Sequence, residues 1–136
     1  MALKKLVEDF EKALKRLKEA CELANLMRDK EHYEFFRDST IQRFEFTTEI
    51  MWKSLKEFLR EKEGIVCKSP KSCIREFFSV GYLKEEETFR LLKAIDDRNR
   101  TSHTYHEEVA EEIFSSIGDY LPLFERVLKT LKGVTK

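Results

Sequence analysis

The sequence lacks any apolar run of the roughly 18–20 residues that a bilayer-spanning helix needs, which excludes a membrane helix. It also lacks an excess of either charge, because 26 acidic side chains balance 26 basic ones. This balance argues against binding nucleic acid through overall charge and leaves room only for a local basic site. Residues 1–5 lead directly into an amphipathic repeat without the apolar core of a signal peptide. The sequence therefore predicts a cytoplasmic protein.

Glycine and cysteine are also scarce. The four glycines do not cluster, which excludes a glycine-rich phosphate loop. The three cysteines, Cys21, Cys67 and Cys73, are an odd number without a secretion signal, which predicts reduced thiols. Cys67 and Cys73 are six residues apart, a spacing that does not fit a zinc knuckle. A regulatory disulfide between them is the alternative.

Apolar residues recur at steps of three and four along most of the chain, which predicts amphipathic helices. The long repeats cover residues 3–24, 41–58 and 109–131, and shorter ones cover 74–78 and 89–95. No stretch alternates convincingly with period two. The sequence predicts an all-α fold: an antiparallel, up-and-down helical bundle of four to five helices in one domain, residues 1–136.

The second long helix is predicted to begin at an N-cap formed by Asp38 or Ser39, after the polar stretch 28–32. Within this helix, a second set of apolar residues widens the buried face beyond a narrow seam: Phe46, Trp52 and Leu59. The sequence therefore predicts that this helix lies centrally in the bundle.

Glycine and proline predict where helices end or bend. Each of three glycines is followed by an apolar residue or tyrosine, a pattern typical of a left-handed helix C-terminus: Gly64, Gly81 and Gly133. Ser69 followed by Pro70 is typical of a helix N-terminus. Gly118 and Pro122 fall inside the last helix and predict a kink or a loosened turn.

Residues 96–106 are eleven consecutive polar or ionisable residues without an aliphatic side chain. This segment therefore either leaves the bundle surface or lines a polar cleft. On an ideal helix Asn99, His103 and His106 share one face, and Arg98, Ser102 and Tyr105 share the adjacent one. Arg98 and His103 lie roughly 140° apart around such a helix and need not touch within one chain. Two chains related by a twofold axis could bring both pairs into one cleft.

These residue types suit phosphodiester chemistry. Arg98 could grip a phosphate with two parallel hydrogen bonds, and His103 could remove or return a proton near neutral pH. With Asn99 or Ser102 orienting the phosphodiester, the set would support metal-independent RNA cleavage by the 2′-hydroxyl. Tyr105 offers a phenol that another enzyme could modify.

Structural interpretations of the same residues are equally simple. Arg98 beside two aspartates fits a surface ion pair, and a histidine near a helix end fits a cap. His103, His106 and Glu107 lack a further ligand, so the sequence predicts no metal site and no cofactor. His32 stands alone in a polar connector and has no predicted role.

The pattern Arg-x4-His-x-Tyr over residues 98–105 resembles the signature of HEPN domains (higher eukaryotes and prokaryotes nucleotide-binding). The resemblance is closest to the prokaryotic HEPN proteins encoded beside minimal nucleotidyltransferases, often called nucleotidyltransferase substrate-binding proteins. Residues 41–47, 52–56 and 97–105 resemble that subfamily in the same order along the chain.

The resemblance implies a role for each matched residue. Arg98 and His103 fall on the pair that cleaves RNA in active members, with Asn99 as the usual polar neighbour. Tyr105 falls on the tyrosine that the partner nucleotidyltransferase adenylylates in toxin–antitoxin members, which silences the nuclease. Those proteins act as homodimers with a cleft at the twofold axis.

Three functions follow as hypotheses. In the first, the chain is the substrate-binding, homodimeric partner subunit of a separate minimal nucleotidyltransferase encoded nearby, within a toxin–antitoxin-like system. It has no Gly-Ser and paired-aspartate motif of its own, so catalysis of nucleotidyl transfer would lie in the partner. RNA or a nucleotide would bind at the substrate-binding set Arg98, Asn99, Ser102 and His103.

The second hypothesis is an enzyme. The chain would be a metal-independent endoribonuclease that uses Arg98, Asn99 and His103 and is silenced by nucleotidylylation of Tyr105. The third is a helical interaction module in which the polar segment is only a surface loop.

Overall fold

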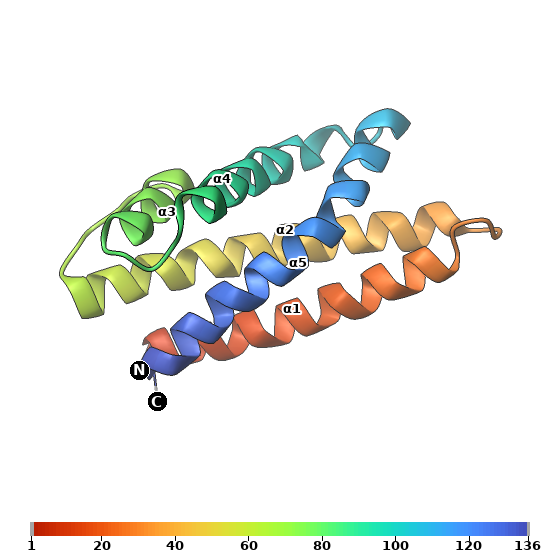
Figure 1. The fold of residues 1–136 in the computed structure, drawn as a ribbon. Coiled ribbons are helices and arrows are strands. Elements are labelled where there is room, and N and C mark those ends of the chain that lie inside the picture. Colours follow the sequence, from red (N-terminus) through yellow and green to blue (C-terminus); the bar gives the residue numbers. More distant parts are fainter. Residues whose placement is uncertain (1, 136) are drawn as a thin grey trace.

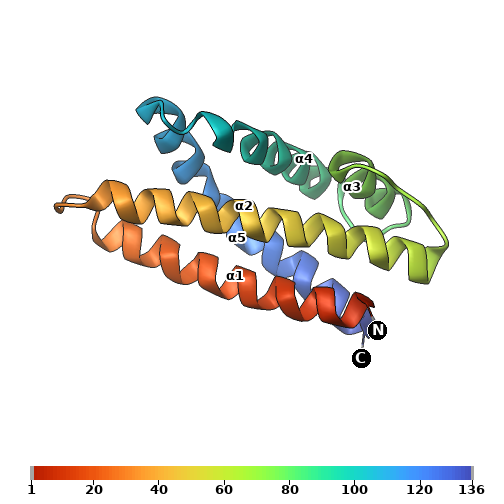
Figure 2. The same cartoon turned by 180° about the vertical axis from the view of Figure 1, so that it is seen from behind.

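The computed structural model describes residues 2–135, which form five α-helices and no strand. Three helices are long and two are shorter: α1 (Ala2–Leu26), α2 (Tyr33–Phe58), α3 (Pro70–Ser79), α4 (Glu85–Asn99) and α5 (Glu107–Thr135). Figure 1 and Figure 2 show α1 and α2 lying antiparallel with α5 packed along them, while α3 and α4 lie on the other side of α2. The all-α antiparallel bundle that the sequence predicts is confirmed. Within residues 2–135, no helix has both the length and the apolar character of a membrane span.

The predicted stripes form the core. The apolar repeat predicted over residues 3–24 is buried in α1, and so are the main apolar positions of α2. The buried residues of α1 are Leu3, Val7, Phe10, Leu14, Leu17, Cys21 and Ala24. At the centre, the Phe44 ring stacks on Tyr120 and Phe124 of α5, with centroids 5.8 and 6.2 Å away. The wider face predicted for α2 is only partly correct. Leu59 is buried and Trp52 is half-buried, but Phe46 is 50% exposed.

The start of α2 corrects the prediction of an N-cap at Asp38 or Ser39. The helix begins at Tyr33, directly after His32, whose backbone is left-handed with φ 69°. Its first turns lack the apolar repeat because Arg37, and not an apolar residue, occupies the buried position one turn before Ile41. A hydrophobic pattern cannot reveal such a position, since charged side chains are buried only when they are paired.

Helix ends follow the predicted glycine pattern at two of three positions. Gly64 and Gly81 are left-handed, with φ 68° and 93°, after the π-helical turn Leu59–Glu63 (η1) and α3 respectively. Gly133 does not end its helix, because α5 continues to Thr135. Glycine disfavours a helix by only about 1 kcal/mol, and it does not break the hydrogen-bond pattern.

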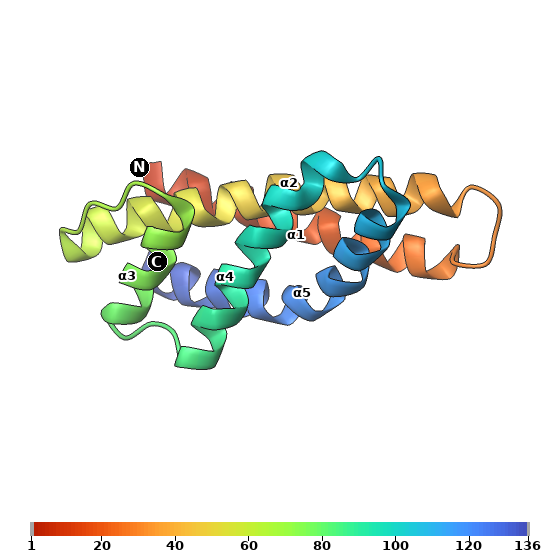
Figure 3. The ribbon, with the colours of Figure 1, turned by 90° about the horizontal axis from the view of Figure 1, so that it is seen from above.

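Neither Gly118 nor Pro122 breaks α5. The helix is continuous from Glu107 to Thr135 with the proline inside it, and Figure 3 shows that its axis curves. The predicted irregularity is therefore a bend within one helix and not an interruption.

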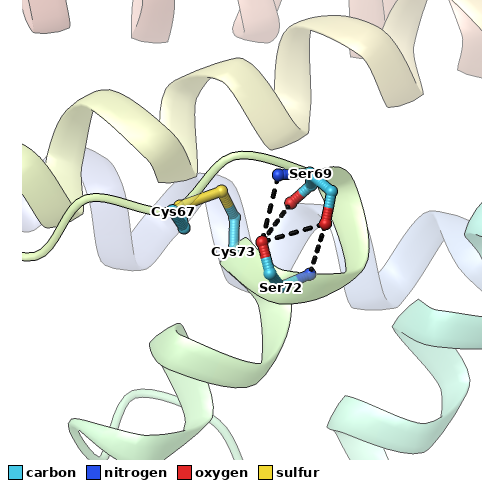
Figure 4. Close-up of a disulfide and its surroundings, with 4 residues drawn as sticks. All are labelled: Cys67, Ser69, Ser72 and Cys73. Atoms are coloured by element: carbon cyan, nitrogen blue, oxygen red, sulfur yellow. Dashed lines mark hydrogen bonds between the residues drawn. A yellow bond between two sulfur atoms is a disulfide. The ribbon is translucent and has the colours of Figure 1, made fainter.

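Cys67 and Cys73 form a disulfide, which corrects the prediction of reduced thiols at these two positions; Cys21 is free and buried. The bond ties the segment after η1 to the first turns of α3 (Figure 4), with the two Cα atoms 5.2 Å apart. Between the cysteines, Ser69 and Ser72 exchange side-chain and backbone hydrogen bonds in a capping box at the start of α3, as Ser69-Pro70 predicts. The pairing needs the close approach that this capped turn creates, and spacing alone does not reveal it.

Reduction of this disulfide is expected to lower the free energy of unfolding by about 2 kcal/mol, because the unfolded chain regains the entropy of a short closed loop. Urea denaturation with and without dithiothreitol measures the difference. A Cys67→Ala/Cys73→Ala variant should unfold at nearly the urea concentration of the reduced protein and should not respond to the reductant. Equal midpoints for the oxidised and reduced wild-type protein would contradict the prediction.

Candidate functional site

The polar segment 96–106 forms the connection between α4 and α5. α4 ends at Asn99, a 3-10 helix (η2) covers Arg100–His103, and α5 begins at Glu107. Figure 1 shows this connection and the connector between α1 and α2 at the end of the bundle opposite the two termini. The side chains of Asn99, Ser102, His103 and Tyr105 are all exposed there. These four side chains face solvent, whereas Asp97 and Thr101 of the same segment are buried, so the segment leaves the packed surface only in part.

Two buried residues hold the connection in place. The Asp97 carboxylate is buried, accepts a hydrogen bond from the Tyr120 hydroxyl of α5 at 2.5 Å, and lies 3.4 Å from Arg100. Burial, and then the hydrogen bond to Asp97, raise the pKa of Tyr120 well above its usual range. The buried Thr101 hydroxyl donates to the carbonyl of Arg98 at 2.7 Å. The exposed residues therefore stand on an anchored turn.

Arg98 points towards α2. Its Nη2 atom donates to Glu49 Oε2 at 3.0 Å, and that carboxylate also accepts from the Trp52 indole at 3.1 Å. The Nε atom of Arg98 is buried and has no hydrogen-bond partner within residues 2–135. Glu49 is a site residue that the sequence analysis missed. Its position three residues before Trp52, between the family-like stretches 41–47 and 52–56, is the one available signal.

His103, Tyr105 and His106 lie together. The Tyr105 hydroxyl is 3.5 Å from Nδ1 of His103, and the two ring centroids are 6.1 Å apart. The His106 ring also lies against Tyr105, and the centroids of these two rings are 4.4 Å apart. Tyr105 is 74% exposed. The structure thus presents an exposed phenol that contacts two imidazoles.

The remaining predicted residues are separated from this group. Ser102 Oγ donates to the carbonyl of Asn99 at 3.4 Å. Arg98 and His103 have different partners, because Arg98 donates to Glu49 and His103 lies beside Tyr105. The helical faces assumed for residues 98–106 are wrong, because η2 replaces the α-helix after Asn99.

An open hollow of about 460 Å³ lies beside the turn, between it and α2. Thr104 contributes from the turn, and the first half of α2 supplies the other lining residues: Phe35, Asp38, Ser39, Ile41, Gln42 and Glu45. Phe35 is largely exposed, and Phe46 is half exposed further along the same helix. The site therefore has exposed aromatic surface next to it.

Buried Arg37 fixes the start of α5. Its guanidinium contacts Glu107 at 2.7 Å, Glu111 at 3.1 Å and Asp38 at 3.0 Å. The hydrogen bond from Arg37 holds the pKa of Glu107 below its usual range. Burial, and then a 2.8 Å hydrogen bond to Glu111, raise the pKa of Tyr33 to about 12. This cluster was not predicted, because Arg37 has the sequence context of a surface residue.

Within residues 2–135, no group of three or more His, Cys, Asp and Glu side chains has the arrangement of a metal site. The chemistry that the described residues offer is that of a phenol, two imidazoles and an arginine.

The fold and the exposed turn define a helical-bundle protein that displays a polar motif between its last two helices. A family model described as "Nucleotidyltransferase substrate binding protein like" matches residues 5–133. The chain belongs to this family, which confirms the family that the sequence resembles.

Solved structures are similar to this chain over nearly its whole length. A protein of Thermus thermophilus is 45% identical, with a TM-score of 0.81 over 90% of this chain and 98% of that one. HI0074 of Haemophilus influenzae, described as a substrate binding domain of a nucleotidyltransferase, is 23% identical, with a TM-score of 0.77 over 93% and 98%.

A toxin–antitoxin structure with AMP-PNP is 12% identical, with a TM-score of 0.68 over 95% of this chain and 96% of that one. At these identities, HI0074 and the toxin–antitoxin protein show the fold alone. No curated protein matches the sequence.

Proposed function

We propose that this chain is the partner subunit of a separate minimal nucleotidyltransferase and presents Tyr105 to that enzyme as a nucleotidyl acceptor. The observation that carries the proposal is the exposure of Tyr105 at the tip of an anchored turn, where its hydroxyl lies beside the exposed His103. A buried or strongly hydrogen-bonded phenol could not reach the active site of a second protein. Tyr120 is such a phenol, because its hydroxyl donates to Asp97 inside the bundle.

Family membership and the relatives support a two-component system. HI0074 is described as a substrate binding domain of a nucleotidyltransferase, and another structure of this fold is part of a toxin–antitoxin pair with AMP-PNP bound. By this analogy the partner supplies the catalytic site and the nucleoside triphosphate, and the reaction takes place in the cytoplasm. The single domain expected for residues 1–136 supplies the acceptor.

The proposed assembly is a homodimer formed over the exposed aromatic surface of α2. Phe35 lines the hollow beside Thr104, Phe46 is half exposed further along α2, and aromatic residues are enriched at protein interfaces. Light scattering after gel filtration tests this assembly. A monomeric mass at micromolar concentration would contradict it.

A metal-independent endoribonuclease is the second candidate. His103 is solvent-exposed and so available to a phosphodiester, while Arg98 is held by Glu49. Cleavage within one chain would therefore need Arg98 to exchange Glu49 for phosphate, or the Arg98 of a second chain to complete the site. This candidate requires RNA cleavage that persists in EDTA and disappears in His103→Ala. Nucleotidylylation of Tyr105 would place a bulky anion beside His103 and silence it.

Tyr105→Phe is expected to abolish nucleotidyl transfer to this chain, because phenylalanine lacks the attacking oxygen. Intact mass after incubation with the partner nucleotidyltransferase and Mg-ATP measures the reaction: the wild-type chain should gain nucleotidyl groups, and the variant none. Tyr82→Phe is the matched control, since Tyr82 donates to Glu63 and precedes α4, whereas the turn follows the opposite end of that helix. Equal gain by wild type and Tyr105→Phe would contradict Tyr105 as the acceptor.

A further inference from the structure

The connection between η2 and α5 gives Tyr105 surroundings that its sequence position does not suggest. Residues two apart in an α-helix point roughly 200° away from each other, so His103 and Tyr105 would lie on opposite sides. Here the His106 amide donates to the His103 carbonyl at 3.1 Å and closes a four-residue turn. The turn brings the Tyr105 hydroxyl to 3.5 Å from His103 Nδ1.

We propose that His103 is the general base that takes the phenol proton when Tyr105 attacks a nucleoside triphosphate bound to the partner enzyme. This inference rests on the proposed function and adds a second reacting residue to it. A neutral phenol is a weak nucleophile, and an adjacent base is the usual way to activate such a hydroxyl. His103 Nδ1 is the ring nitrogen that lies beside the Tyr105 hydroxyl, and it accepts a proton in the tautomer that carries hydrogen on Nε2.

The reaction balances without any further reagent. The Tyr105 Oη atom forms a bond to the α-phosphorus, and the bond between that phosphorus and the α–β bridging oxygen breaks. Pyrophosphate leaves with the electron pair, and the phenol proton moves to His103 Nδ1 and then to water. The present 3.5 Å separation is long for a hydrogen bond, as is common for catalytic pairs before the substrate binds.

His106 has a different role in this arrangement. Its ring lies 4.4 Å from that of Tyr105 at an interplanar angle of 42°, so it supports the phenol from the side. The hydroxyl that reacts is paired with His103 instead. His106 is therefore a positioning residue, and its loss should affect the reaction less than the loss of His103.

The test is the single-turnover rate of Tyr105 modification, measured by intact mass with the partner nucleotidyltransferase at saturating concentration and Mg-ATP. His103→Ala should slow the reaction by about 10²- to 10⁴-fold, the usual contribution of a general base. Added imidazole should restore part of the lost rate, because it can enter the space left by the side chain. His106→Ala should lose no more than about tenfold and show no such rescue. His32→Ala, another exposed histidine, should react like wild type.

The outcomes separate this inference from the function on which it rests. Full-rate modification of His103→Ala would overturn the role of His103 and leave Tyr105 as the acceptor. Slow modification that imidazole does not restore would assign His103 a structural role and also overturn the inference. Wild-type protein that binds the partner but gains no mass would overturn both the acceptor and its base.

Discussion

Replacing Glu107 and Glu111 together with glutamine is expected to lower the free energy of unfolding, but by less than the roughly 3–5 kcal/mol that a buried charge without any partner costs, because Asp38 stays beside Arg37 and both replaced carboxylates are at least partly exposed. Arg37 is only 2% exposed and makes its contacts with these two carboxylates and Asp38. Among the described residues, the double variant leaves Asp38 as the carboxylate that pairs with the guanidinium. Urea denaturation of the wild type and the variant gives the difference.

Arg37→Met separates this effect from ordinary loss of contacts. Added to the double-glutamine variant, it removes the buried charge and should restore most of the lost stability. No restoration would show that the cost does not come from the charge of Arg37. Arg28→Met is a suitable surface control, since the exposed ion pair between Arg28 and Glu111 contributes little.

The same cluster makes the free energy of unfolding depend on pH in the acid range. Arg37 lowers the pKa of Glu107 in the folded protein, so the stabilisation is fully present above the ordinary glutamate pKa of about 4.3. This stabilisation is lost as the pH falls through the pKa that Glu107 has in the folded protein. The stability difference between the wild type and the double-glutamine variant should therefore narrow below about pH 4. A difference that stays constant in acid would contradict this linkage.

Phe44→Ala is expected to destabilise the protein by about 3–5 kcal/mol, because it leaves a cavity where α2 meets α5. Phe44 is fully buried and stacks on Tyr120 and Phe124. Phe46→Ala, two residues along the same helix, is the matched control and should cost far less, since Phe46 is half exposed. Thermal and urea unfolding measure both variants. Similar losses for the two would mean that Phe46 is covered in solution, as in the homodimer proposed over α2.

The core could be read from the sequence because it follows a single physical rule. Each long helix buries one apolar stripe, and the spacing of that stripe is visible in the chain. The rule fails where a polar residue takes a core position or an aromatic residue faces solvent. Arg37 and Phe46 are those two cases, and both depend on which side chains of other helices lie opposite.

The candidate site was predicted as a set of residues but not as an arrangement. Its residues were recognisable because eleven consecutive polar positions interrupt an otherwise regular pattern. Their assumed helical geometry was wrong, because the chain leaves the α-helix at Asn99. The contact between His103 and Tyr105 follows from that departure and could not be read from residue spacing.

The class of fold, the buried stripes, two of the glycine helix ends and the segment that carries chemistry could all be predicted from the chain, since each depends on residues close together in it. Helix packing in three dimensions was needed to show that Arg98 pairs with Glu49, that Asp97 binds Tyr120, and that Arg37 is buried among carboxylates of α5. The tertiary structure also decided the disulfide between Cys67 and Cys73, for which a capped turn had to bring the two sulfurs together. These contacts join side chains through the packing of separate helices or the exact path of a turn, which local periodicity does not record.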